Sequence, residues 1–182
     1  MSVIATPTAI DDAPEASRAQ LQAVEKMLGS VPNMFRLIAT SPATLDGYLG
    51  LSGALGKGKL GPAMRERIAL AVSQQNGCDY CLAAHNYLAT NLARLTPEDI
   101  AAARQAASDD PRIDAALKFA SALVRERGHV SAEEVQAVRD AGYSDGEVLE
   151  IIGAVAVDTL TNYVNTALGT EIDFPAVDRL AV

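Results

Sequence analysis

The 182-residue sequence has few aromatic residues, no tryptophan and only two cysteines. It has no apolar run near the roughly 18 residues that a membrane-spanning helix needs. Residues 1–7 show no basic region followed by an apolar segment, so we expect no signal peptide and a cytoplasmic location. Two cysteines are too few for a secreted scaffold that is held together by several disulfides.

The chain also has no excess of positive charge. Its 15 lysine and arginine residues are outnumbered by 23 aspartate and glutamate residues, which gives a net charge of −8. Binding to nucleic acid phosphates requires clustered lysine and arginine. Adsorption to an anionic membrane surface has the same requirement. We therefore expect neither nucleic acid nor a membrane among the partners of this chain.

The composition favours an all-α fold. Hydrophobic residues make up 49% of the chain, enough for a buried core, while period-two alternation and hairpin signals are absent. We expect a flexible N-terminal arm over 1–13, a single helical domain over 14–169 and a C-terminal tail over 170–182. Start and stop signals predict helices at 14–28, 42–55, 62–76, 78–92, 97–107, 111–127 and 145–168, and a short one through residue 39 with Asn33 as its N-cap. A capping box at Ser131 opens another helix, a second box at Ser144 opens the helix over 145–168, and the helix over 62–76 has one apolar face.

The two cysteines lie three positions apart, at Cys78 and Cys81, near the start of a predicted helix. A disulfide between such close neighbours adds little chain-entropy stabilisation. In a cytoplasmic chain such a pair is more often redox-active or metal-binding. His85 follows Cys81 by four residues, so all three side chains share one face of the helix.

Glu66 precedes Cys78 by 12 residues, on the helix predicted over 62–76. A turn at Gly77 should fold the two helices back on each other, so that Glu66 reaches His85. The thiolate is the reactive form of cysteine. An imidazole could take its proton, and a carboxylate could orient and charge that imidazole. A second cysteine converts a sulfenic acid into a disulfide.

The identity of the attacking cysteine depends on two opposing effects. Cys78 lies closer to the helix N-terminus, where the dipole favours a thiolate by about 0.3–1 kcal/mol. Cys81 lies one turn from His85, and a positioned base contributes about 10²–10⁴ in rate. The larger effect predicts that Cys81 attacks and that Cys78 resolves.

The motif formed by Glu66, Cys78, Cys81 and His85 resembles the active site of the AhpD-like alkylhydroperoxidase branch of the carboxymuconolactone decarboxylase superfamily. Segments 31–36 and 161–165 resemble its peroxidase-related subgroup. The resemblance implies an AhpD-like helical bundle with the cysteine pair at the start of a core helix, and homo-oligomers, either trimers or hexamers. It further implies a thiol peroxidase in which the second motif cysteine reacts with peroxide, the first resolves, and the glutamate and histidine relay protons.

The family pattern leaves several points open. Tyr80 stands where the AhpD protein itself has a histidine, so the reductant need not be the lipoylated partner of AhpD. The oxidant is a peroxide or a disulfide, the thiol reductant is unidentified, and no cofactor is implied. Tyr80 and Tyr87 are predicted to pack near the site, and His129 to lie on the surface. Asn162 and Asn165 share a helix face, where they could serve the site or an oligomer contact.

Two other functions fit parts of the same pattern. Two cysteines, a histidine and a glutamate could form a zinc site in a helical binding module. A decarboxylase-type enzyme that acts on a small lactone is also compatible with the superfamily, although such chemistry is not expected to need the cysteine pair.

Overall fold

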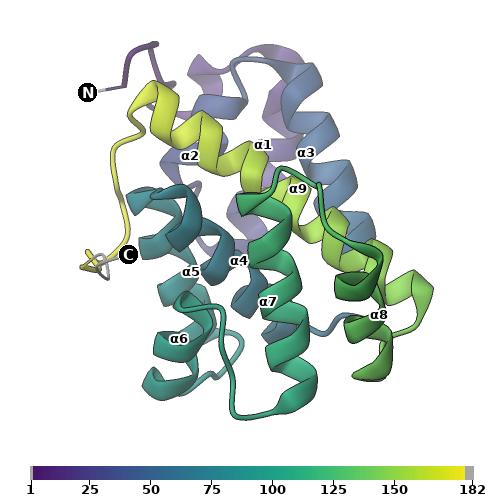
Figure 1. Ribbon diagram of the computed structural model, residues 1–182. Helices are drawn as coiled ribbons and strands as arrows, with labels where there is room; N and C mark the ends of the chain where they lie inside the picture. The colour runs from purple at the N-terminus through teal and green to yellow at the C-terminus, as the bar shows by residue number, and fades with distance from the viewer. Residues whose placement is uncertain (1, 179–182) are drawn as a thin grey trace.

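The computed structural model describes residues 2–178, and this part of the chain contains helices and no β-strand (Figure 1). The all-α class is therefore confirmed. Most of the expected helices begin and end within a residue or two of the predicted positions. The elements are η1 (Ile10–Asp12), α1 (Glu15–Leu28), α2 (Asn33–Ile38), α3 (Pro42–Leu55), α4 (Pro62–Asn76), α5 (Asp79–Asn91), α6 (Pro97–Arg104), α7 (Pro111–Arg125), α8 (Ala132–Asp140) and α9 (Asp145–Leu168).

Local capping signals fix most of the helix starts. The side chain of Ser41 accepts a hydrogen bond from the backbone N–H of Thr44 at the start of α3. Complete capping boxes open α6, α8 and α9, each satisfying two backbone N–H groups that the helix itself leaves unpaired. The predicted boxes at Ser131 and Ser144 are both present.

Among the boundaries that differ from the prediction are those of α2, α6 and α7. Asn33 is the first residue of α2 rather than its cap, and its side chain instead donates to the carbonyl of Glu171. Helices α6 and α7 end at Arg104 and Arg125, earlier than expected. Shortly after each end a residue adopts positive φ, 53° at both Ala106 and Arg127, which stops the helix.

Helix α4 lies at the centre of the fold, in contact with α5, α6, α7 and α9 (Figure 1). The prediction gave α4 a single apolar face, but every residue from Ile68 to Gln74 is buried because neighbours surround this segment. One hydrophobic cluster joins α4 to α6, α7, α8 and α9. A second joins α1, α2 and α3 to the start of α5 and contains both cysteines.

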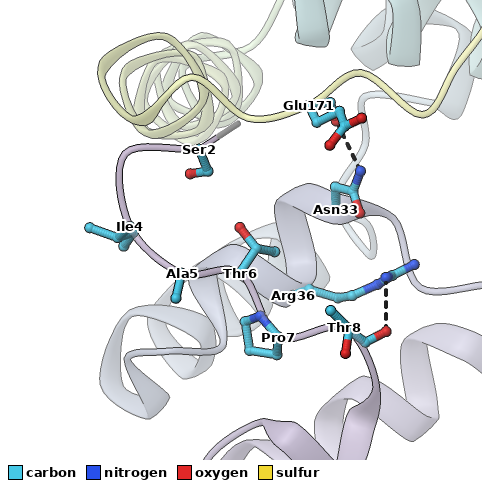
Figure 2. A pocket seen from close by; sticks show the side chains of 9 residues that line it. All are labelled: Ser2, Ile4, Ala5, Thr6, Pro7, Thr8, Asn33, Arg36 and Glu171. Atoms are coloured by element: carbon cyan, nitrogen blue, oxygen red, sulfur yellow. Dashed lines mark hydrogen bonds between the residues drawn. The ribbon is translucent and has the colours of Figure 1, made fainter.

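The N-terminal arm lies beside α2 and the segment that follows α9 (Figure 2). The N–H of Val3 donates to the carbonyl of Leu168 over 2.7 Å, and Nη1 of Arg36 donates to the carbonyl of Thr8 over 3.1 Å. The arm expected over 1–13 thus contacts α2 and the end of α9, around a hollow of about 420 Å³. Residue 1 of this arm and residues 179–182 of the expected tail lie outside the described residues.

Within residues 2–178, no helix combines the length and apolar character that crossing a membrane requires.

Candidate active site

The site is built on the sharp turn between α4 and α5. Gly77 has φ 66° and ψ 34°, a left-handed conformation that glycine adopts without steric cost. At a rise of about 1.5 Å per residue, Glu66 lies roughly 16 Å and His85 roughly 12 Å from this turn along their helices. The packed helices bring the two side chains together, with Oε2 of Glu66 2.9 Å from Nδ1 of His85. The sequence predicted this contact.

Cys78 is the N-cap of α5 rather than its first residue. Its Sγ accepts a hydrogen bond from the N–H of Cys81 over 3.3 Å, as a capping side chain does. Both cysteines are free thiols, with 1% of Cys78 and 2% of Cys81 exposed. Sγ of Cys81 also accepts a hydrogen bond from Nδ2 of Asn165, on α9, over 3.3 Å.

The two thiols differ in their tendency to ionise. A hydrogen bond from the Cys81 thiol, together with the Cys81 N–H and the charge of His85, outweighs burial and lowers the pKa of Cys78 to about 7. The same interaction with Cys78, together with burial, raises the pKa of Cys81 far above its usual range. As the pH rises through about 7 the pair therefore acquires a single negative charge, and that charge rests mainly on Cys78.

His85 carries the complementary positive charge. Burial favours the neutral ring, but the carboxylates of Glu66 and Asp158 outweigh burial and raise the pKa of His85 to about 9. At neutral pH the ring is therefore an imidazolium. The proton that His85 was expected to take from a cysteine is already on it, so the resting ring is a proton donor.

Asp158, on α9, is the site residue that the sequence analysis missed. Its Oδ1 lies 3.9 Å from Nε2 of His85, on the side of the ring opposite Glu66. Burial is the main cause that raises the pKa of Asp158 to about 7. A signal was present in the sequence: Asp158 is an acid within an apolar helix, and it shares a face with Asn162 and Asn165, four and seven residues later.

A cavity of about 890 Å³ connects these groups to the surface. Cys81 lines it together with Glu66, His85, Asp158 and Asn165, whereas Cys78 is not among the lining residues. Much of the remaining wall is apolar and aromatic, as in small-molecule binding sites. It includes Phe35, Tyr48, Leu49, Leu88, Val157 and Phe174.

Within the part of the chain that the structure describes, two polar atoms of the cavity-lining residues are buried without a hydrogen-bond partner. They are Nε of Arg65 and Oδ1 of Asn165. Buried polar atoms are normally paired, so unpaired ones in a cavity wall are suited to a polar ligand.

The segment after α9 forms one rim of the cavity. The hydroxyl of Tyr80 donates to Oδ1 of Asp173 over 2.8 Å and accepts from the N–H of Met34 over 3.1 Å. The ring of Phe174 packs edge-on against Tyr80 and at a tilt against Tyr87, both at 5.8 Å. Tyr80 and Tyr87 are therefore packing residues beside the site, as predicted, and Tyr80 also holds the segment that carries Asp173.

The other predicted polar residues do not line the cavity, although a hydrogen bond with the Asn162 side chain acts to lower the pKa of Cys81. Asn162 is fully buried and bonds to Ser73 and Asn76, 3.3 Å and 2.8 Å away. His129 is exposed, as expected. Among the described residues, no group of three or more His, Cys, Asp or Glu side chains is arranged to hold a metal ion.

The model of the carboxymuconolactone decarboxylase family matches residues 42–126, a span that contains all four motif residues. No protein of curated function matches the chain.

Solved structures of similar proteins cover nearly all of the chain. A peroxidase-related protein with an alkylhydroperoxidase AhpD core, from Ralstonia eutropha JMP134, is 26% identical with a TM-score of 0.83, over 94% of this chain and 92% of that one. A peroxidase-related protein from Silicibacter sp. TM1040 is 25% identical with a TM-score of 0.81, over 93% and 91%. The debrominase Bmp8, in a variant complexed with 2,3,4-tribromopyrrole, is 26% identical with a TM-score of 0.77, over 95% and 94%.

Proposed function

We propose that this chain, whose resemblance to the AhpD-like branch of the carboxymuconolactone decarboxylase superfamily is confirmed by the family model and the solved structures, is a thiol-dependent peroxidase. One observation carries the proposal: Cys81 opens on a cavity with apolar walls, while Cys78 lies behind it, outside the cavity lining. A peroxide can therefore reach Cys81, and Cys78 is shielded from it. An organic hydroperoxide matches the apolar walls.

The first step is attack by Cys81. The charge that rests on Cys78 passes to Cys81 when the Cys81 proton moves to the Cys78 sulfur. The Cys81 thiolate then attacks the terminal oxygen of ROOH, the O–O bond breaks, and Cys81 becomes a sulfenic acid. The alkoxide leaves and takes the proton of the His85 imidazolium, giving ROH. Ionisation thus favours Cys78, while access to the cavity favours Cys81 as the attacking residue.

The second step closes the disulfide. Neutral His85, still held by Glu66, accepts the Cys78 proton, and the Cys78 thiolate attacks the Cys81 sulfur. The sulfenic hydroxyl leaves as water after it takes that proton from His85. The thiols have then lost two electrons to the peroxide, and an external dithiol returns them by thiol–disulfide exchange.

Mass spectrometry after one equivalent of tert-butyl hydroperoxide tests the proposal. The wild type should lose two hydrogens and form a Cys78–Cys81 bridge. Cys81→Ser should abolish turnover, whereas Cys78→Ser should leave a sulfenic acid at Cys81 that dimedone traps. Thiols that stay free in the wild type, or a dimedone adduct on Cys78 in Cys81→Ser with retained turnover, would contradict the assignment.

Reductive debromination is a second candidate, favoured by the aromatic side chains of the cavity wall. Phe35, Tyr48 and Phe174 line a space that can take a flat ring. A similar structure is that of a debrominase with a brominated pyrrole. The same thiol pair would supply two electrons, converting Ar–Br and two thiols into Ar–H, a disulfide and HBr. Bromide release from 2,3,4-tribromopyrrole under reducing conditions would support this activity, and its absence would exclude that substrate.

The remaining alternatives have direct tests as well. Full activity of a Cys78/Cys81 double serine variant on a lactone would favour the decarboxylase-type reaction. Stoichiometric zinc, measured by elemental analysis of protein purified without chelator, would favour the metal-binding module.

A further inference from the structure

The amide of Asn165 has one end bonded and one end unpaired. Nδ2 donates to Sγ of Cys81 over 3.3 Å, while Oδ1 is buried and has no hydrogen-bond partner in residues 2–178. Only 3% of Asn165 is exposed, and the residue lines the cavity. An unpaired buried acceptor is costly, so one beside a reactive sulfur suggests that a ligand completes its bonding.

We propose that Asn165 positions the hydroperoxide, with Oδ1 accepting a hydrogen bond from the O–H of ROOH while Nδ2 holds Sγ of Cys81. This inference rests on the proposed peroxidase function and names the group that selects its substrate. The hydroperoxide is thereby distinguished from peroxides and disulfides that have no O–H.

The chemistry of a hydroperoxide makes this placement effective. The oxygen that carries the hydrogen is also the oxygen that the thiolate attacks. A hydrogen bond of about 2.7–2.8 Å to Oδ1 therefore brings the electrophilic atom to the sulfur that the same amide holds. Fixing the reacting atoms about 3–3.5 Å apart is a recognised source of rate enhancement.

An amide suits this role better than a charged side chain. It supplies a donor to the sulfur and an acceptor to the substrate from one planar group. A carboxylate would place a second negative charge beside the thiolate and raise its pKa. Asn162, one turn earlier, shows the contrast, because it is bonded to Ser73 and Asn76 and does not line the cavity.

The test compares two reagents on three proteins of similar side-chain volume at the site: wild type, Asn165→Leu and Asn165→Asp. Stopped-flow kinetics would give the rate constants for tert-butyl hydroperoxide and for methyl methanethiosulfonate, which reacts with thiolates but has no O–H or N–H. The ratio of the two constants removes any change in thiolate content. Asn165→Ala replaces the leucine variant if thermal melting shows that leucine does not pack.

We expect the hydroperoxide-to-thiosulfonate ratio to fall about tenfold in Asn165→Leu, the loss typical of one hydrogen bond. Asn165→Asp, which keeps an acceptor at this place, should react more slowly with both reagents and retain the ratio. If the wild type reacts with the hydroperoxide and the ratio is unchanged in Asn165→Leu, the proposed role of Asn165 is overturned and the peroxidase proposal stands. A wild type that reacts only with the thiosulfonate overturns the peroxidase proposal and the role of Asn165 with it.

Discussion

Replacing Glu66 by glutamine should convert His85 from an imidazolium into a neutral ring at physiological pH. The carboxylate lies 2.9 Å from Nδ1, and it is the largest of the influences that raise the pKa of His85 from 6.5 to about 9. That rise corresponds to roughly 3 kcal/mol of preference for the charged ring. Burial acts in the opposite direction, so once the carboxylate is removed we expect the His85 pKa to fall by about two units or more.

Proton NMR titration of the imidazole C–H signals measures this directly. The chain has only two histidines, and exposed His129 is an internal control whose signals should be the same in wild type and Glu66→Gln. The His85 signals should shift near pH 9 in the wild type and below neutrality in the variant. The variant should also reduce tert-butyl hydroperoxide more slowly near pH 8, because the leaving alkoxide loses its proton donor.

The pH dependence of the free energy of unfolding provides an independent check on the raised pKa of His85. Folding raises the pKa of His85, so its contribution to the free energy of unfolding is complete below pH 6.5 and is lost as the pH rises through about 9. Urea unfolding should therefore separate wild type from Glu66→Gln by roughly 3 kcal/mol on the acid side, and by much less above that range. A wild-type His85 that titrates near 6.5, or an unchanged His85 in the variant, would refute the argument.

Three further predictions test neighbouring parts of the site. The rate of sulfenic acid formation should rise with pH near 7 and fall near 9, and Asp158→Asn should move the alkaline limb to lower pH, because a carboxylate that favours the charged ring of His85 is removed. Gly77→Ala should lower the free energy of unfolding by about 1–2 kcal/mol in urea, since alanine is strained at φ 66°; equal stability would show that the turn relaxes. Tyr80→Phe should lower the free energy of unfolding by about 1–3 kcal/mol, because the N–H of Met34 loses its acceptor. The variant also loses the hydrogen bond to Asp173, so limited proteolysis should cut the segment at Asp173 faster than in the wild type.

The sequence predicted most of the helices because their ends are coded locally. Ser41 followed by Pro42, and the serine–glutamate boxes at Ser131 and Ser144, satisfy backbone groups within a few residues of the chain. Boundaries that depend on distant contacts were less predictable. Asn33 was expected to cap α2, but it instead meets the segment that follows α9.

The contact between Glu66 and His85 could also be predicted from the sequence. It requires only two helices of known length and a glycine that reverses the chain between them. The charge of His85 could not be predicted from the sequence, since it depends on the burial of the ring and on the carboxylate of Asp158, more than 70 residues away in the chain.

The sequence by itself determined the all-α class, the placement of Cys81 and His85 one turn apart on the same helix, and the approach of Glu66, because helical periodicity and a local turn decide all of these. It did not determine the position of Cys78, which precedes the helix as its N-cap and lies outside the cavity lining. The tertiary structure decided which thiol faces the cavity and which one carries the charge. It also decided that α9 brings Asp158 to His85 and Asn165 to Cys81. Those properties depend on burial and on side chains from different helices, which spacing along one segment does not encode.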